Sequence, residues 1–393
     1  MEGDLIYINK KLKPLSWLYG LGVGFRNMLF EAGILRSRSY KVPVISVGNI
    51  TVGGTGKTPH VEYLIRLLKN QMNVAVLSRG YKRKSHGFVL AGKDTTMREI
   101  GDEPFQMKQK FPDITVAVDK KRTRGIDKLT SGDYVKDIDV ILLDDAFQHR
   151  YVKPGINILL VDYHRLVIYD DLLPAGRLRE PIKSKDRADI VIVTKCPTDL
   201  KPMEFRVITK AMGLYPYQQL FFSTHEYDAL VPLGPQGDLR HAEDLSSLTG
   251  KHVLLLTGIA SPEQMLLDLQ AYTDQIQPLA FGDHHNFRRK DVERINAAFA
   301  ALPSPRIIIT TEKDACRLSV AEGLSDEVRQ SLYVLPIHVK LLQDQEETFN
   351  QKIIDYVRKN SRNSILAKGK DDYKPKDSDR PGDRPRTISF RNN

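Results

Sequence analysis

The segment VISVGNITVGGTGKTP, residues 44–59, is an apolar run followed by a glycine-rich turn and a helix expected to begin near Lys57. Glycines let successive backbone N–H groups converge on phosphate oxygens, and a helix N-terminus adds the positive end of its dipole. The segment therefore predicts a nucleotide phosphate site with Lys57 as its mobile charge; the alternative is a purely structural turn. The residues expected to bind nucleotide are Thr51, Val52, Gly53, Gly54, Thr55, Gly56, Lys57 and Thr58.

This loop departs from the strict GxxxxGK[ST] pattern, because Thr51 stands where that pattern has glycine. It is similar to the GGxGKT variant instead. Val52 replaces the lysine that often precedes the glycine pair of that variant, so a second lysine supplied by a dimer is not indicated.

Short β-branched runs alternate with helical patterns along the first half of the chain, which predicts a doubly wound, mostly parallel α/β sheet of the P-loop NTPase type. Several runs are apolar throughout, as strands covered on both faces should be. The expected strands are residues 42–47, 74–77, 115–118, 139–143, 156–161 and 190–193.

A second, smaller α/β lobe is expected after the polar stretch at 231–249, with strands at 252–256, 306–310 and 333–338. The expected organisation is an amphipathic, membrane-associating N-terminal helix in residues 1–40, the P-loop domain in 41–230, the second lobe in 231–360 and a disordered charged tail in 361–393.

Composition narrows the functional classes. The net charge of +10 favours an anionic partner such as nucleic acid, an anionic lipid surface or a phosphorylated substrate. The only cysteines, Cys196 and Cys316, form no CxxC motif, which argues against a disulfide framework or structural zinc.

The apolar segment 15–35 is flanked by basic residues and interrupted by Arg26 and Glu31. It predicts either an amphipathic helix at a membrane surface or a helix packed on the protein's own core.

Acidic residues follow the expected strand at 139–143. Asp144 and Asp145 stand where a Walker-B-like carboxylate must reach a metal ion beside the P-loop, because ligands bind at the carboxyl ends of parallel strands. With Thr58 they are the predicted Mg²⁺ ligands. The alternative role for Asp145 is capping a helix.

Asp102 of GDEP and the histidine pair His284 and His285 are further candidates for proton transfer. Asp102 is equally well placed to cap a helix, and the histidines are compatible with a metal site or an ordinary surface loop. Arginines also follow several strands: Arg79 in SRGY, Arg122 with Arg124 as its rival, and Arg179 in PAGRLREP. They are candidates for holding phosphates, although each is individually more typical of a solvated surface.

Taken together, the motifs resemble the tetraacyldisaccharide 4'-kinase (lipid A 4'-kinase) family of Gram-negative bacteria over about residues 10–355. The motifs, in chain order, are GNITVGGTGKTP, SRGY, GDEP, DDAFQH, PAGRLREP, FGDHHNF and TEKDA. The resemblance implies transfer of the ATP γ-phosphate to the 4'-hydroxyl of an acylated glucosamine disaccharide 1-phosphate, forming lipid IVA.

The resemblance also assigns roles to residues. It implies that Asp102 and His284 form a base dyad, and that Lys57 with Thr58 serves the phosphates and Mg²⁺ beside Asp144 and Asp145. The substrate-binding positions that it implies are Asn49, Arg79, Tyr81, Arg122, Gln148, His149, Arg179 and Glu180.

The implied partners are ATP, Mg²⁺ and an anionic glycolipid, with a monomer held peripherally on the cytoplasmic face of the inner membrane and no nucleic acid. The rivals from other classes are a P-loop NTPase switch or assembly factor, and a basic nucleic-acid binder.

Overall fold

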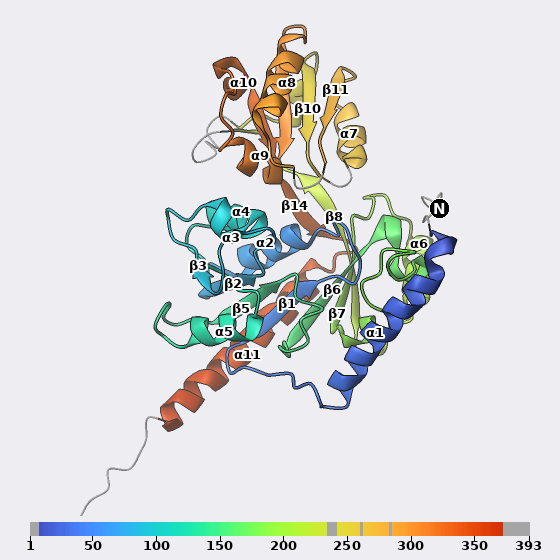
Figure 1. The fold of residues 1–393 in the computed structure, drawn as a ribbon, viewed down its shortest axis with the longest axis vertical. Coiled ribbons are helices and arrows are strands. Elements are labelled where there is room, and N and C mark those ends of the chain that lie inside the picture. Colours follow the sequence, from blue (N-terminus) through green and yellow to red (C-terminus); the bar gives the residue numbers. More distant parts are fainter. Residues whose placement is uncertain (1–7, 234–241, 260–261, 283–284, 372–393) are drawn as a thin grey trace, which may run out of the picture.

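The computed structural model describes residues 8–233, 242–259, 262–282 and 285–371. It contains a large domain built on a nine-stranded sheet and a second lobe built on a five-stranded sheet, which stands above the large domain in Figure 1. The expected doubly wound, mostly parallel fold with a smaller α/β lobe is confirmed.

The large sheet has the strand order β14-β8-β7-β6-β1-β5-β2-β4-β3, and all neighbouring pairs are parallel except those at its two edges. The central strands are buried apolar runs, because helices cover both faces. The strands are β1 Val44–Gly48, β2 Val74–Ser78, β3 Val89–Leu90, β4 Thr115–Val118, β5 Val140–Asp144, β6 Ile156–Asp162, β7 Ile190–Thr194, β8 Gln219–Tyr227 and β14 Ile337–Leu341.

Two layers of helices enclose this sheet. Apolar residues of α2, α4 and α11 pack on one face, whereas those of α5 and α6 pack on the other. The N-terminal helix α1 lies along the outside of the second layer (Figure 1). The helices of this domain are α1 Lys13–Glu31, α2 Lys57–Leu68, α3 Met97–Ile100, α4 Asp102–Lys110, α5 Arg122–Thr130, α6 Pro202–Met212 and α11 Glu346–Asp371.

The second lobe repeats this layered plan on a smaller scale, with strand order β11-β10-β12-β13-β9. Helices α8, α9 and α10 pack on one face of its sheet and α7 on the other. The strands are β9 Val231–Pro232, β10 His252–Thr257, β11 Ile276–Ala280, β12 Arg306–Thr311 and β13 Leu332–Leu335; the helices are α7 Glu263–Gln270, α8 Arg289–Ala300, α9 Glu312–Leu318 and α10 Asp326–Gln330.

The end of the chain differs from the expectation. The run 333–338 is not one strand of the second lobe: it is divided at Pro336 between β13 and β14, and β14 pairs with β8 of the large sheet. Helix α11 then buries Phe349, Ile353 and Val357 in the core of the large domain. The stretch 337–360 therefore lies outside the second lobe. The helix also continues to Asp371, into the expected tail, of which residues 372–393 lie outside the described residues.

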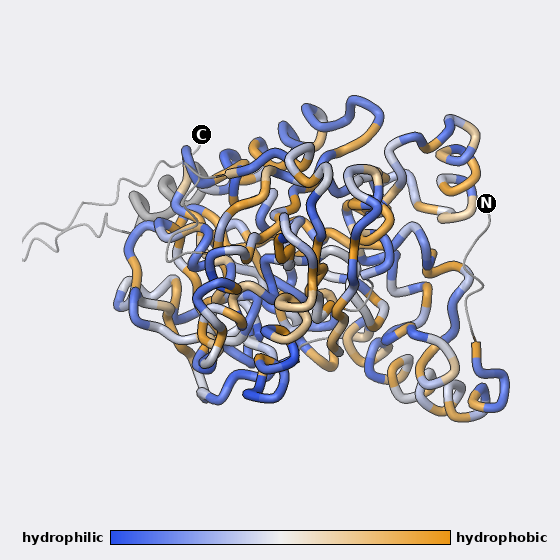
Figure 2. Tube along the Cα trace, turned by 90° about the horizontal axis from the view of Figure 1, so that it is seen from above, coloured by the Kyte–Doolittle hydropathy of each residue, from blue (hydrophilic) through white to orange (hydrophobic). Residues whose placement is uncertain are grey.

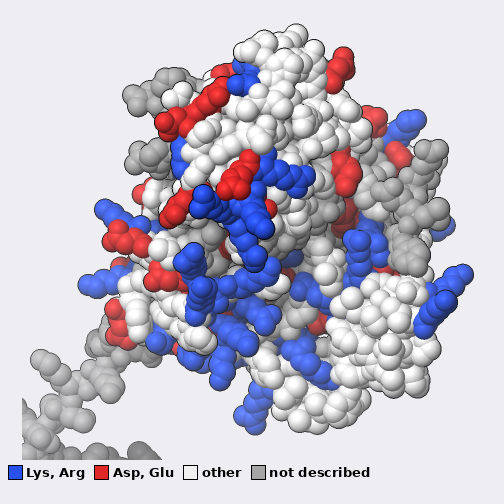
Figure 3. All heavy atoms as spheres, turned by 45° about the horizontal axis from the view of Figure 1, so that its top comes forward, with Lys and Arg blue, Asp and Glu red and all other residues white. Residues whose placement is uncertain are grey.

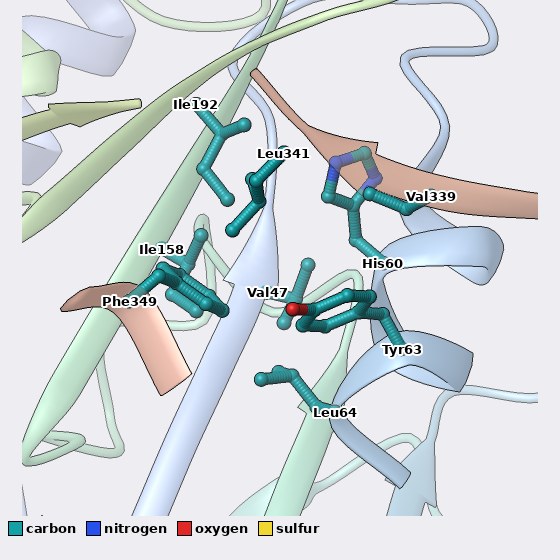
Figure 4. A pocket seen from close by; sticks show the side chains of 9 residues that line it. All are labelled: Val47, His60, Tyr63, Leu64, Ile158, Ile192, Val339, Leu341 and Phe349. Atoms are coloured by element: carbon teal, nitrogen blue, oxygen red, sulfur yellow. The ribbon is translucent and has the colours of Figure 1, made fainter. Parts of the chain in front are cut away.

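Hydrophobic segments occupy much of the interior of the trace and also lie at its periphery on the N-terminal helix (Figure 2). A small apolar cavity lies between the large sheet, α2 and α11 (Figure 4). Its volume of about 10 Å³ is near the minimum for a single water molecule, so it belongs to core packing and not to a substrate site. The side chains lining it are Val47, His60, Tyr63, Leu64, Ile158, Ile192, Val339, Leu341 and Phe349.

Candidate active site

The glycine-rich loop runs from the end of β1 to the start of α2, as expected. Gly48 ends β1, and a Cβ at that position would lie 2.7 Å from the Cβ of Phe147, so only glycine fits beside this neighbour. Gly53 and Gly56 have φ angles of +118° and +75°, which side chains other than glycine rarely adopt. Space beside Gly54 is open. The backbone of the loop is therefore accessible for the close approach of a phosphate.

Buried polar side chains hold the loop from beneath. Asn49 donates from Nδ2 to Thr55 Oγ1 at 2.8 Å, and Thr194 Oγ1 donates to the Thr55 carbonyl at 3.1 Å. His60 Nδ1 donates to the Gly56 carbonyl at 2.7 Å, while its Nε2 lies 3.0 Å from Ser223 Oγ. Burial lowers the pKa of His60 to about 4, which keeps the ring neutral and lets Nε2 accept the serine proton. These contacts fix the loop before a ligand binds.

The segment 174–181 supports the loop from its other side. The Val52 amide donates to the Arg177 carbonyl at 2.8 Å, and the Arg179 amide donates to the Ile50 carbonyl at 2.7 Å. Val52 itself is 47% exposed. Thr51, in contrast, is buried in this pairing, opposite Leu178. PAGRLREP is thus paired directly with the loop through its backbone.

Three charged groups converge beside the loop. Arg179 Nη2 donates to Asp145 Oδ1 at 3.1 Å and also binds the Asn49 side chain. Lys57 Nζ lies 3.8 Å from the same Asp145 oxygen. Burial opposes ionisation of Asp145, but Lys57 and Arg179 together hold the pKa of its carboxyl below the usual value. Asp145 is therefore a carboxylate whose negative charge faces the loop.

Asp144 differs from its neighbour. It ends β5, level with Val47 of β1, and accepts a hydrogen bond from Ser78 Oγ at 2.9 Å. Burial, Glu103 and Asp145 raise its pKa to about 6, although Lys57 opposes the shift. Burial and two neighbouring acidic groups thus disfavour the charged form of Asp144, and a cation bound at the carboxyl end of β5 would favour it.

These residues fit a Mg²⁺ ion bound together with nucleotide phosphates. Among the described residues, no group of three or more His, Cys, Asp or Glu side chains could hold a metal by itself. Mg²⁺ in phosphotransferases is usually bound by one or two carboxylates, with the substrate phosphates completing its ligands. Thr58 in the first turn of α2 and the pair Asp144 and Asp145 match that donor set.

The positions expected to contact substrate form the set of wall residues: Asn49, Arg79, Tyr81, Arg122, Gln148, His149, Arg179 and Glu180. Arg122 is buried and donates to the carbonyls of Asp144 and Asp119 at 3.1 and 3.0 Å, and burial lowers its pKa to about 10. Its rival Arg124 instead pairs with the Asp119 carboxylate. The structure therefore brings Arg122, and not Arg124, to the acidic strand end.

The DDAFQH segment contributes two further members of the wall. Gln148 Nε2 donates to the Asn49 carbonyl at 2.6 Å, and its own carbonyl accepts from Arg26 of α1 at 3.1 Å. Burial and the nearby guanidinium groups of Arg122, Arg26 and Arg79 lower the pKa of His149 to about 4. His149 is therefore a neutral ring among cations.

Arg79 and Tyr81, on the loop after β2, are exposed, and Tyr81 has 53% of its surface accessible. Glu180 differs from them: it is buried and paired with Arg187 Nη2 at 2.5 Å. Lys and Arg side chains also gather in the middle of the face drawn in Figure 3, below the second lobe.

Asp102 is the first residue of α4, and its side chain binds Arg317 of α9 in the second lobe. The following residue, Glu103, is close enough to Asp144 to raise the pKa of the Asp144 carboxyl. Helix α4 therefore begins near the acidic strand end. His284, the expected partner of Asp102, lies outside the described residues. The adjacent His285 pairs with Asp291 through Nε2 at 2.9 Å and stacks on Phe281, so it stabilises the start of α8.

Sequence reasoning missed Arg317, Ser78 and His60. Arg317 carried one signal: it follows Asp314 by three residues, the spacing of an ion pair on a helix. Nothing in the local pattern indicated its partner in α4, because Asp102 and Arg317 are 215 residues apart in the sequence.

The family model described as Tetraacyldisaccharide-1-P 4'-kinase matches residues 8–358. A tetraacyldisaccharide 4'-kinase of Phocaeicola vulgatus is 60% identical over 368 residues, covering 93% of this chain and all of that protein. The same enzyme of Bacteroides thetaiotaomicron is 54% identical over 375 residues, with 93% and 98% covered.

Among solved structures, LpxK from Aquifex aeolicus in complex with ATP matches with a TM-score of 0.69 and 30% identity. The match covers 89% of this chain and 99% of that one. The similarity thus extends through both lobes of the described structure.

Proposed function

The chain belongs to the tetraacyldisaccharide-1-P 4'-kinase family, and from this membership we propose how its residues carry out that family's reaction. It is a tetraacyldisaccharide 4'-kinase of lipid A biosynthesis, so the alternative of an NTPase switch is not favoured. The observation that carries the proposal is that one matched region contains the glycine-rich loop, the acidic strand end and α4. The acceptor would be the 4'-hydroxyl of the tetraacyldisaccharide 1-phosphate.

Catalysis would rest mainly on positioning and charge neutralisation, as phosphoryl transfer demands. Lys57 and the amides of Gly53–Gly56 would bind the β- and γ-phosphates of ATP. Mg²⁺ held by Thr58, Asp144 and Asp145 would neutralise charge on the phosphate oxygens. Asp102, assisted by His284, would orient the 4'-hydroxyl and accept its proton.

The wall residues would hold the acceptor. Arg79, Arg122 and His149 influence one another electrostatically, which supports a common role near the anionic disaccharide. Tyr81 would contact the sugar from the exposed loop. Asn49, Gln148 and Arg179 would join the acceptor site to the phosphate loop, which the hydrogen bonds among them support. Glu180 would act indirectly, because its ion pair with Arg187 would support the wall residues.

A transfer assay tests the function directly. Purified protein given γ-labelled ATP, Mg²⁺ and a tetraacyldisaccharide 1-phosphate acceptor is expected to label the lipid, and chelation of Mg²⁺ should abolish the labelling. A matched reaction with an acceptor lacking the free 4'-hydroxyl should remain unlabelled. Hydrolysis of ATP without labelled lipid would contradict the proposed function and favour an NTPase switch.

The N-terminal helix supports a peripheral site of action. One face of α1 packs on the large domain through Ser16, Asn27 and Phe30, which are all buried. The opposite face leaves Trp17 and Phe25 exposed by 67% and 59%. Such a helix, with lysines before it and arginines after it, suits the boundary of an anionic membrane. No helix in the described part of the chain is long and apolar enough to span a bilayer.

Trp17→Glu combined with Phe25→Glu is therefore expected to reduce binding to vesicles containing anionic lipid by at least about tenfold, because each aromatic group contributes about 1.5–3 kcal/mol when buried. Vesicle co-sedimentation measures this. Leu267→Glu, at a 60% exposed position in α7, is the matched control and should bind like the unaltered protein. Unchanged binding of the double variant would rule out α1 as the docking surface.

A further inference from the structure

Arg317 is a buried arginine that reaches from the second lobe into the large domain. Its side chain is only 1% exposed. Nε and Nη2 both donate to Asp102 Oδ2, the former at 3.2 Å, and Nη1 donates to Asp314 Oδ1 at 3.2 Å. One guanidinium group therefore joins a carboxylate of α4 to a carboxylate of its own helix.

Asp314 is itself fixed from behind. It is fully buried and accepts hydrogen bonds from the Gly258 amide and from Thr311 Oγ1, both at 2.8 Å. Thr311 caps the N-terminus of α9 by accepting from the Asp314 amide. The guanidinium thus rests on a rigid assembly at the carboxyl ends of β10 and β12, and its direction toward α4 is set by that assembly.

A second charged contact joins the same two helices. Lys110 at the end of α4 lies 2.5 Å from Glu312 of α9 and 2.7 Å from Glu62 of α2. This contact docks α9 on α4 without touching Asp102. Removing the Lys110 contact would therefore affect only the docking of the lobes. Removing Arg317 would affect both the docking and the orientation of the Asp102 carboxylate.

We propose that Arg317 is a positioning residue for phosphoryl transfer, which orients the Asp102 carboxylate from the second lobe. The inference rests on the proposed role of Asp102 as the base. A planar guanidinium that binds Asp314 and Asp102 together fixes the direction of both, which an ammonium group cannot do. Because Arg317 binds one oxygen of the Asp102 carboxylate, it also sets the direction of the other oxygen. The base is therefore aligned only while α9 is docked on α4.

The test is a cycle of four proteins: the unaltered chain, Arg317→Met, Asp102→Asn and the double variant. Arg317→Met is expected to lower kcat by about 100-fold, because a small misplacement of a reacting group has an effect of that size. The KM for ATP should change little. The double variant should be no slower than Asp102→Asn alone, since Arg317 acts through that carboxylate. Independent, multiplying losses in the double variant would overturn the inference.

Lys110→Met is the matched control, because it removes the other charged contact between α4 and α9. It is expected to retain kcat within a few-fold of the unaltered protein; a loss as large as that of Arg317→Met would show that docking alone matters, and would overturn the inference. If Arg317→Met does not fold, Arg317→Lys takes its place in the cycle, because it keeps the charge and loses the planar fork. A Lys variant with unaltered kcat would also overturn the inference.

The positioning role of Arg317 and the proposed function can fail separately. Near-normal activity of Asp102→Asn would remove the base from the proposed function. An inactive Asp102→Asn variant together with independent effects of Arg317 would leave the proposed function standing and remove only the positioning role.

Discussion

Asp102→Asn is expected to lower kcat for lipid phosphorylation by about 10²- to 10⁴-fold, the usual contribution of a general base. Asparagine has nearly the shape of aspartate and can still accept a hydrogen bond from Arg317, but it cannot take the proton of the acceptor hydroxyl. The KM for ATP should stay nearly unchanged, because nucleotide binding is proposed for the loop at 51–58. Initial rates at saturating ATP and acceptor measure the effect.

Asp113→Asn is the control for this variant, because Asp113 is exposed and lies just beyond the end of α4. It should keep full activity. His284→Ala is expected to cause a loss of the same order as Asp102→Asn if the two act as a dyad. A variant at either position with unaltered kcat would exclude that residue from proton transfer.

Lys57→Met is expected to lower kcat/KM for ATP by about 10²- to 10³-fold, the size found when one preorganised electrostatic group is removed from an active site. The lost charge would no longer stabilise the phosphate oxygens as charge shifts during transfer. The fold should be little affected, because Arg179 continues to pair with Asp145 at 3.1 Å. Steady-state kinetics with varied ATP, together with a thermal unfolding curve, separates the two effects.

Lys69→Met offers a comparison on the same helix. Lys69 caps the C-terminal end of α2, far along the helix from the loop, and lies over the Phe111 ring. It should retain normal kinetics. If Lys57→Met phosphorylated the lipid as fast as the unaltered protein, the assignment of the loop to the transferred phosphate would fail.

The glycine-rich loop and the acidic strand end were predictable because their signals are local. An apolar strand, glycines at constrained positions and a helix start all lie within residues 44–59. Asp144 and Asp145 follow a buried run, and the parallel sheet places the ends of β1 and β5 side by side. Local chemistry together with one rule of sheet topology was therefore sufficient to predict that Lys57 and Asp145 lie close together.

The second lobe was harder to delimit. The run 333–338 has the composition of a single strand, yet its two halves join different sheets on either side of Pro336. Hydrophobicity and β-propensity report that a residue is buried in a sheet, but not in which sheet. The packing of α11 on the large domain was not predicted for the same reason, because the apolar face of a helix does not identify the surface that covers it.

The N-terminal helix illustrates the same limit. The sequence left open whether its apolar residues face the protein or a membrane, and the structure divides them between a packed face at Phe30 and an exposed face at Trp17. The exposed face supports the proposed docking on lipid.

The sequence by itself thus determined the α/β class, the glycine-rich loop between a strand and a helix, the acidic strand end and, through the resemblance of its motifs, the family. Each of these depends on contacts within a short segment or between adjacent parallel strands. Only the tertiary structure decided that Arg122 rather than Arg124 meets Asp144, that α11 completes the large domain, and that Arg317 binds Asp102. These pairings join groups far apart in the chain. Burial, hydrogen bonding and charge complementarity select such partners only after the elements that carry them have packed together.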